Sequence, residues 1–226
     1  MAENKVLRVV PLGGLGEIGR NMMVLEYGED IIVVDVGLMF PEEEMLGVDL
    51  VIPDFTYLRE NREKLRAVFL THGHEDHVGA LPYFMREFNV PIYGARLTDG
   101  LIRVKLQEHR LLQNAETHVV VPGEVIPAGA FEVEFFTVAH SIPDACGLII
   151  RTPLGPIVHT GDFKLDHTPV MDQHTDLIRL AQVGAEGCLL LLADSTYAEQ
   201  EGYTPSEQLV GEALRNILVN AKGRVV

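Results

Sequence analysis

Four side chains that commonly bind metal ions fall within six consecutive residues, in the order His-x-His-x-Asp-His. They are His72, His74, Asp76 and His77. Imidazole and carboxylate donors together suit zinc, and they suit manganese or iron less well. The spacing lets one loop serve two neighbouring cations, His72 and His74 on the first, Asp76 and His77 on the second. A polar surface loop that merely contains three histidines is the alternative, and further ligand candidates downstream argue against it.

The residues on either side of this histidine loop (residues 71–77) indicate how the chain positions it. Residues 67–70 are an apolar run typical of a buried strand, and residues 78–82 are typical of the start of a helix. Side chains alternate along a strand, so His72 and His74 can point to the same side at its end. The pattern therefore predicts a buried strand, a tight ligand-bearing loop and a helix start.

Two later strands are predicted to deliver similar side chains at their ends. His140 follows an apolar strand expected over residues 132–138, and Asp162 follows one expected over residues 156–160. Taken alone, His140 would be a buried core histidine and Asp162 a turn residue. With the histidine loop already present we predict both as ligands, and we predict that the two oxygens of Asp162 bridge two cations.

Residues 13–19 are rich in glycine. Gly14, Gly16 and Gly19 match the spacing GxGxxG, and Asp35 lies about where a ribose-binding acid would. A dinucleotide site needs a helix after the glycines, whereas residues 22–35 have the pattern of a β-hairpin. We therefore interpret the segment as backbone that passes close to a ligand such as the substrate. Asp35 either orients a metal-bound histidine or caps the end of its strand.

The remaining pattern predicts further helices and strands. Helices are expected over 54–66, 81–88, 97–112, 176–183 and 204–219, the last starting with a capping pattern, and further strands over 6–11, 91–94, 117–121, 146–151, 189–193 and from 223 onward. The amphipathic pattern of the helix over 97–112 predicts four inward residues. These are Leu101, Val104, Leu106 and Leu111.

The strand expected over 189–193 is entirely apolar and is predicted to be buried. It ends in Asp194, Ser195 and Thr196. A carboxylate and two hydroxyls at that rim either assist a substrate or cap a turn.

Composition limits the class of protein. The 226 residues are 47% hydrophobic and 23% charged, which is typical of a globular protein, and no apolar run is long enough to span a bilayer. The two cysteines form no CxxC pair, so we expect a cytoplasmic protein without a disulfide framework. A net charge of −15 argues against general nucleic-acid binding by surface charge, but not against nucleic acid held at bound metals.

These motifs together resemble the metallo-β-lactamase superfamily. Asp35, the histidine loop, His140 and Asp162 resemble its first four motifs. Segments 11–19, 71–77, 140–144, 159–164 and 194–196 resemble the ribonuclease J family of its β-CASP branch, over essentially the whole chain. The resemblance implies the α/β (α+β) class and an αββα sandwich, with residues 1–226 as the first part of the lactamase domain. In that family the β-CASP domain and the last zinc-ligand histidine follow downstream, so we expect half an active site here.

The resemblance also implies an activity, a ligand set and partners. It implies a zinc-dependent ribonuclease that cuts single-stranded RNA internally and trims it from the 5′ end, acting in RNA processing and decay. One Zn²⁺, or Mn²⁺, would bind His72, His74 and His140, and the other would bind Asp76 and His77, with Asp162 between them. Asp76, His77 and Asp162 would be catalytic and Asp35 would orient a ligand histidine. The full-length parent is expected to be a homodimer or tetramer.

A structural calcium is a further implication of the resemblance. Gly47 and Asp49 match positions that bind calcium in some members. Carboxylate and backbone carbonyl oxygens suit that hard cation. The remaining ligand would again lie downstream.

Spacing alone does not select RNA as the substrate. Another dinuclear-zinc hydrolase of the same fold, glyoxalase II-like or a lactonase, is one alternative. A non-catalytic metal-binding or assembly module is a second. A diiron redox protein is disfavoured, because His74 stands where redox members tend to have an acidic residue.

Overall fold

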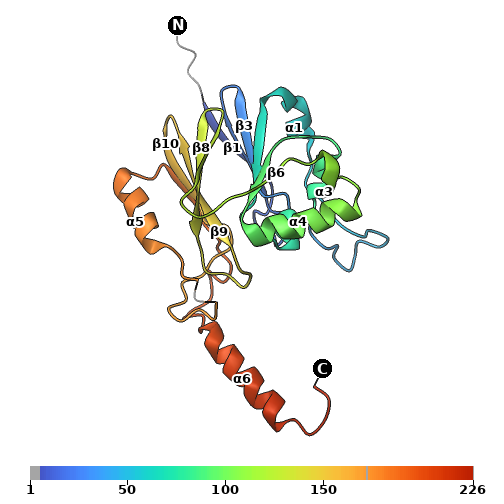
Figure 1. Cartoon of the computed structure of the whole chain (residues 1–226), viewed down its shortest axis with the longest axis vertical. Helices are drawn as coiled ribbons and strands as arrows, with labels where there is room; N and C mark the ends of the chain where they lie inside the picture. The colour runs from blue at the N-terminus through green and yellow to red at the C-terminus, as the bar shows by residue number, and fades with distance from the viewer. Residues whose placement is uncertain (1–5, 172, 226) are drawn as a thin grey trace.

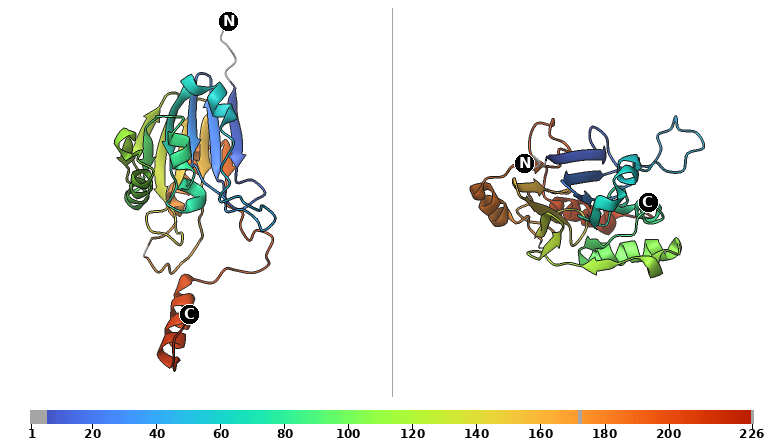
Figure 2. Two further views of the ribbon diagram at one scale, coloured as in Figure 1. Left: turned by 90° about the vertical axis from the view of Figure 1, so that its right-hand side faces the viewer. Right: turned by 90° about the horizontal axis from the view of Figure 1, so that it is seen from above.

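A computed structural model describes residues 6–171 and 173–225. Two β-sheets pack face to face, and helices cover the outer face of each (Figure 1). Figure 2 shows the same layers from the side and from above. The layer order of helix, sheet, sheet and helix confirms the predicted αββα sandwich.

The first sheet has six strands in the order β1-β2-β3-β4-β5-β6. The strands are β1 (Leu7–Gly13), β2 (Met22–Tyr27), β3 (Asp30–Val34), β4 (Leu65–Phe69), β5 (Ile92–Gly94) and β6 (Thr117–Val119). β2 and β3 are antiparallel neighbours, so the predicted hairpin after the glycine-rich segment is confirmed. From β3 to β6 the strands are parallel, and their carboxyl ends therefore meet at one edge of the sheet.

The helices on the outer face of this sheet are short apart from one. They are α1 (Thr56–Glu60), the 3₁₀ turn η1 (Arg62–Lys64), α2 (Glu75–Val78), α3 (Leu81–Met85), α4 (Arg96–Glu108) and the 3₁₀ turn η2 (Leu112–Asn114). Apolar side chains of β2, β3 and β4 pack against α1, α3 and α4 in the first core. The helix predicted over 54–66 is shorter, because the chain leaves the helical conformation at Asn61 and β4 begins at Leu65.

One prediction for α4 is wrong. Leu101 and Val104, expected to face inward, are 39% and 59% exposed. Leu106 is buried as predicted and Leu111 is partly buried, but the buried face continues through Ile102, Thr98 and Asp99 rather than through Leu101 and Val104. The apolar residues of this segment outline two overlapping helical faces, and packing against the sheet selects the one centred on Ile102.

The second sheet has five strands in the order β11-β10-β9-β8-β7. They are β7 (Val125–Ala128), β8 (Phe131–Thr137), β9 (Cys146–Thr152), β10 (Gly155–His159) and β11 (Leu190–Leu192). Strand alternation divides β8 between two cores. Val133 and Phe135 pack between the sheets, whereas Phe136 packs on the other side, toward α5 (Leu177–Glu186).

The C-terminal region departs from two predictions. β11 is an edge strand rather than a buried one, and Leu191 is 59% exposed because it faces away from the sheet's covered surface. The strand expected from residue 223 onward does not form over 223–225, and Val226 lies outside the described residues. α6 (Glu207–Asn220) begins at the N-cap Ser206 and projects from the body of the molecule (Figure 1). No described helix is long and apolar enough to cross a membrane.

Candidate metal centre

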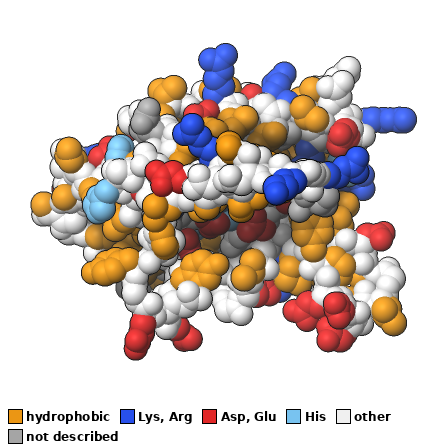
Figure 3. Space-filling model, turned by 90° about the horizontal axis from the view of Figure 1, so that it is seen from below, with side chains coloured by type: hydrophobic (Ala, Val, Ile, Leu, Met, Phe, Trp, Pro, Cys, Tyr) orange, Lys and Arg blue, Asp and Glu red, His pale blue; other side chains and the backbone are white. Residues whose placement is uncertain are grey.

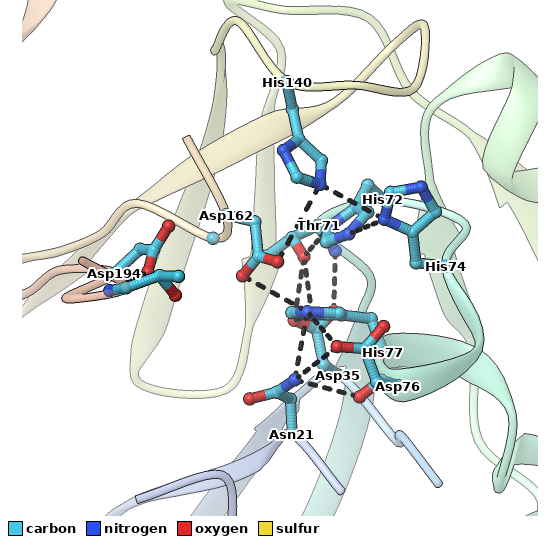
Figure 4. A network of polar contacts seen from close by, with 12 residues as sticks. Asn21, Asp35, Thr71, His72, His74, Asp76, His77, His140, Asp162 and Asp194 are labelled. Atoms are coloured by element: carbon cyan, nitrogen blue, oxygen red, sulfur yellow. Dashed lines mark hydrogen bonds and ion pairs between the residues drawn. The ribbon is translucent and has the colours of Figure 1, made fainter. Parts of the chain in front are cut away.

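The predicted ligand residues meet beyond the carboxyl ends of β4, β8 and β10 (Figure 4). The histidine loop leaves β4, His140 follows β8, and Asp162 follows β10. A backbone bridge between Ala139 and Lys164 holds the segments after β8 and β10 side by side. Three strand ends that are far apart in the sequence thus bring their side chains to one place.

Three imidazoles form the outer cluster of this centre. His72 Nε2 lies 3.1 Å from His74 Nδ1, and His140 Nε2 lies 3.2 Å from the same nitrogen. His72 is buried, whereas His74 and His140 are half-buried. β8 therefore brings His140 to the histidine loop, as the sequence predicts.

These three ring nitrogens fit a cation better than they fit one another. His74 Nδ1 faces two other ring nitrogens, yet it has only one hydrogen or one lone pair with which to serve both contacts. A metal–nitrogen distance of ~2.0–2.1 Å places the nitrogens of a tetrahedral site about 3.3–3.4 Å apart. The observed separations of 3.1 and 3.2 Å are close to that spacing.

A second cluster lies deeper and shares His72. His72, His77 and Asp162 offer ligand atoms that all lie within 4.8 Å of one another. His77 Nε2 is 3.3 Å from Asp162 Oδ1, and His140 Nε2 is 3.8 Å from the other oxygen of Asp162. Asp162 therefore lies between the two clusters, as expected of a bridging carboxylate. Asp76 Oδ2 is 3.6 Å from His77 Nε2, at the edge of the deeper cluster.

A buried carboxylate fixes the rings from behind. Asp35 has a positive φ of 60° and is 1% exposed. Its Oδ2 accepts a hydrogen bond from His77 Nδ1 at 2.8 Å, and its two oxygens accept from the Thr71 N–H and hydroxyl, each at 2.8 Å. The Thr71 oxygen in turn lies 3.0 Å from His72 Nδ1. Both rings thereby use Nδ1 for the network and turn Nε2 toward the centre, so Asp35 orients a ligand candidate rather than capping a strand.

The charge states suit cation binding. Burial, followed by the neighbouring His77, lowers the pKa of His72 to about 2, which leaves it a neutral donor. Burial opposes a charge on His77, but the carboxylates of Asp35 and Asp162 outweigh it and raise the pKa of His77 to about 10. Burial also opposes the charge of Asp162, yet the hydrogen bond from His77 holds the pKa of that carboxyl well below its usual range. Without a cation, the His77 proton therefore fills the space that a cation would take.

The acids of the centre have no Lys or Arg partner among the described residues. Asp35, Asp76 and Asp162 form ion pairs with histidine rings instead. Figure 3 shows the molecule from below, with Lys and Arg gathered toward one side and acidic and hydrophobic side chains elsewhere. Bound cations would neutralise this negative charge.

A cavity of about 270 Å³ opens beside the deeper cluster. Its floor includes Asp76, His77 and Asp162, and one wall is the glycine-rich segment 13–19. The opposite wall is formed by residues 192–196, which include both Ser195 and Thr196. Asp194 itself caps the turn, because its Oδ1 accepts from the Thr196 N–H at 2.8 Å. The glycines thus pass close to the space where a substrate would bind, and the two hydroxyl residues stand at its rim.

Sequence reasoning missed two residues of this centre, Thr71 and Asn21. Thr71 lies next to the first histidine, and its position directly before a ligand was the available signal. Asn21 follows the glycine-rich segment, and its side-chain amide reaches Asp76 and His77. No local pattern marks Asn21, because its partners lie 55 and 56 residues away.

The other predicted or excluded ligands lie outside the two clusters. His159, which follows Val158 on β10, is half-buried and accepts a hydrogen bond from the Gly161 N–H at 3.0 Å. Asp49 is exposed and belongs to neither cluster. Gly47 beside it has a positive φ of 78°. Calcium at Gly47 and Asp49 stays a prediction.

Comparison with known proteins agrees with this arrangement. The family model of the metallo-beta-lactamase superfamily matches residues 15–196. Ribonuclease J of Thermus thermophilus is 51% identical over 97% of this chain and 39% of its own length. Ribonuclease J2 of Bacillus subtilis is 45% identical over 97% of this chain and 40% of its own length. The chain thus spans about two-fifths of the length of these curated relatives.

Solved structures show the same fold. A protein of unknown function from Enterococcus faecalis superposes with a TM-score of 0.68 at 25% identity, over 96% of this chain and 58% of that one. Zn(2+)-bound PqqB from Methylobacterium extorquens superposes with a TM-score of 0.55 at 13% identity, over 88% of this chain and 78% of that one, a likeness of fold alone. Since the family model covers most of the residues, this chain belongs to the metallo-β-lactamase superfamily.

Proposed function

We propose that this chain carries the cation-binding part of a zinc-dependent ribonuclease. The substrate is single-stranded RNA, which the whole protein cuts internally and trims from the 5′ end during RNA processing and decay. The similarity to proteins named ribonuclease J, at 45–51% identity over nearly the whole chain, supports the choice of RNA. A cytoplasmic location and a homodimer or tetramer belong to the same proposal.

The convergence of His72, His74, His140 and Asp162 is the observation that carries the proposal. Imidazole and carboxylate donors are the set that zinc takes in hydrolases. Two divalent cations bound there would supply activation of water and neutralisation of the charge that develops on a phosphoryl group. Zinc is preferred over manganese because nitrogen donors predominate in both clusters.

The chain's own residues have distinct roles in this proposal. His72, His74 and His140 hold one cation, while Asp76 and His77 hold the other and Asp162 lies between them. Asp35 and Thr71 fix the His77 and His72 rings so that Nε2 points inward. Ser195 and Thr196, at the rim of the cavity, are placed to donate hydrogen bonds to phosphate oxygens. Since the acids of the centre have no Lys or Arg partner among the described residues, RNA is held at the cations rather than by a basic surface.

The test compares the His72→Ala and His118→Ala variants of the whole protein in their metal content and in their cleavage of RNA. His72 belongs to both clusters, so its removal is expected to lower the affinity for zinc strongly. The loss should exceed the roughly 10–100-fold that follows when a residue hydrogen-bonded to a ligand is removed. Cleavage of a 5′-monophosphorylated RNA is expected to be abolished. His118 pairs with Glu116 on the surface, far from either cluster, and its variant should match the unsubstituted protein.

Two results would contradict the proposal. Cleavage of RNA at an unchanged rate by the His72→Ala variant or by metal-free protein would exclude the cation mechanism. Faster hydrolysis of a thioester or a lactone than of RNA would instead indicate an ester hydrolase of the same fold.

A further inference from the structure

Asn21 lies between the glycine-rich segment and the deeper cluster, and the sequence gives it no role (Figure 4). Its Nδ2 lies 3.1 Å from the Asp76 carbonyl oxygen, 3.3 Å from Asp76 Oδ2 and 3.1 Å from His77 Nε2. We propose that Asn21 is a positioning residue that holds Asp76 in place beside His77 for one of the two cations, and that Gly14 leaves room for its amide. The inference rests on the proposed cation centre.

The contacts determine which way the amide points. In the opposite orientation, Oδ1 would face two oxygens of Asp76 at hydrogen-bond distance, which is repulsive. With Nδ2 toward Asp76, the two amide hydrogens go to the carbonyl oxygen and to the carboxylate. Both hydrogens are then used, so His77 Nε2 is left for Asp162 or a cation. The amide therefore orients the Asp76 carboxylate without occupying the His77 nitrogen.

Two glycines make room for this arrangement. A Cβ on Gly14, which has a φ of 84°, would lie 2.4 Å from Asn21 Oδ1. A Cβ on Gly37 would lie 1.6 Å from the Asp76 carbonyl oxygen, and the Gly37 N–H donates to the Asn21 carbonyl at 2.9 Å. The Asn21 N–H also donates to the Asp76 carbonyl at 3.0 Å. Gly14 and Gly37 are thus explained by the close approach of Asn21 to the histidine loop, whereas a Cβ on Gly16 would meet nothing within 4 Å and one on Gly19 would meet Met39 instead.

The contacts of Asn21 are confined to one cluster. It touches Asp76 and His77 and forms no hydrogen bond to His72, His74 or His140. Loss of its side chain is therefore expected to lower the affinity for one cation and to leave the affinity for the other unchanged. A general structural role would weaken both cations or neither.

The decisive comparison is Gly14→Ala against Gly16→Ala, titrated with Zn²⁺ against a chromogenic chelator. Both glycines have positive φ, 84° and 72°, so both variants carry similar backbone strain. The added methyl group at Gly14 meets Asn21, whereas a Cβ at Gly16 has nothing within 4 Å. Gly14→Ala is expected to lower the affinity for one Zn²⁺ by about 10–100-fold and to leave the affinity for the other unchanged. Gly16→Ala is expected to leave both unchanged, and equal effects of the two variants would overturn the inference.

Asn21→Leu provides an independent test, with Asn61→Leu as its control. Leucine has a similar size but no donor, and the backbone hydrogen bonds of residue 21 remain. Asn61 also donates its side-chain amide to a backbone carbonyl, that of Tyr57, at 2.9 Å. It lies at the C-terminal end of α1 and belongs to neither cluster. The visible spectrum of the Co²⁺-loaded protein should change in Asn21→Leu, because the geometry around one cation alters, and should stay the same in Asn61→Leu.

Other outcomes separate this inference from the proposed function. If Asn21→Leu fails to fold, Asn21→Ser replaces it and should give the same selective loss. Unchanged binding of both cations in these variants would overturn the role of Asn21 while leaving the ribonuclease proposal intact. An unsubstituted protein that binds no Zn²⁺ would overturn the cation centre and this inference with it. Absence of RNA cleavage by the whole protein with normal Zn²⁺ binding would contradict only the proposed substrate.

Discussion

The first sheet buries one carboxylate near each of its two ends, and the two are neutralised in different ways. Glu26 lies near the end of β2 that points away from the candidate centre, and it is 2% exposed. Asp35 directly follows β3 at the centre and is 1% exposed. A buried carboxylate requires partners in either place, because burial without them is costly.

At the Glu26 end the chain supplies the opposite charges itself. Lys64 Nζ lies 3.0 Å from Glu26 Oε1, and Arg8 lies 3.4 Å from Oε2. The hydroxyl of Tyr57 donates a short hydrogen bond to the same carboxylate. Although burial alone would raise it, these partners together lower the pKa of Glu26. This end is complete without any ligand.

At the Asp35 end the chain supplies donors but little positive charge. Asp35 is bonded to Thr71 and His77, and the next groups outward are Asp76 and Asp162, which are acids again. Protonated His77 is the cation that the chain provides there. The comparison shows that one end of the sheet is neutralised by its own Lys and Arg, while the acids at the other end have no Lys or Arg partner among the described residues, in keeping with the proposed metal centre.

Replacing each carboxylate by alanine should give the largest difference between the two ends. Asp35→Ala leaves the Thr71 and His77 donors buried without an acceptor, so the free energy of unfolding should fall by about 3–5 kcal/mol. It should also lower the affinity for Zn²⁺ by about 10–100-fold, because the His77 ring loses the hydrogen bond that orients it. Glu26→Ala should cost about 1–3 kcal/mol and leave Zn²⁺ affinity unchanged, since the partly exposed Arg8 and Lys64 can turn to water.

Urea unfolding measures the first effect, and competition with a chelator measures the second. Asp35→Asn is the control for shape, because asparagine tolerates the positive φ of this position. It should weaken Zn²⁺ in the same way as Asp35→Ala does. An equal loss of Zn²⁺ affinity in Glu26→Ala would remove the distinction between the two ends.

The two ends should also respond to pH in opposite directions in the metal-free protein. The pKa of His77 is raised from 6.5 to about 10, so its contribution to stability is complete below pH 6.5 and is lost as the pH rises to 10. The pKa of Glu26 is lowered from 4.5, so its contribution is present above pH 4.5 and is lost as the pH falls. The effect should be smaller than that of Asp35→Ala, because no buried donor loses its partner outright.

Urea unfolding at a series of pH values, with His77→Gln and Glu26→Gln for comparison, separates the two contributions. The difference in unfolding free energy between the unsubstituted protein and His77→Gln should shrink from pH 6 toward pH 10. The difference from Glu26→Gln should shrink below pH 4.5. A His77→Gln difference that is the same at pH 6 and pH 10 would mean that this ring carries no charge in the folded protein.

What the sequence predicted reflects how local each signal is. Strand ends are local: an apolar run that stops at His72, His140 or Asp162 identifies both the strand and the side chain at its tip. β8 and β10 both run antiparallel to β9 and therefore end at the same edge of the second sheet, and packing of the two sheets brings that edge beside the end of β4. The pattern of the hairpin after the glycine-rich segment is local too, and it argued against a dinucleotide site there, because such a site needs a helix after the glycines.

The errors and omissions concern information that is not local. The buried face of α4 depends on the sheet beneath it, so the inward assignment of Leu101 and Val104 failed. β11 has the composition of a buried strand, yet its exposure follows from its place at the sheet edge. Asn21 was missed because only the folded chain brings it to residues 55 and 56 positions further along.

Tyr57→Phe should have the smallest effect, and it tests whether the Glu26 end is independent of the centre. Burial, followed by the hydrogen bond to Glu26, raises the pKa of Tyr57 to about 12, so the hydroxyl stays protonated and donates at pH 7. Phenylalanine keeps the ring, and Lys64 and Arg8 still neutralise Glu26, so the loss is one hydrogen bond of about 1 kcal/mol. Urea unfolding should give this loss equally with and without saturating Zn²⁺, because no described contact of Tyr57 reaches the cluster residues. A loss that depends on Zn²⁺ would show that the two ends of the sheet are coupled, and that the Glu26 cluster contributes to holding the metal ligands in place.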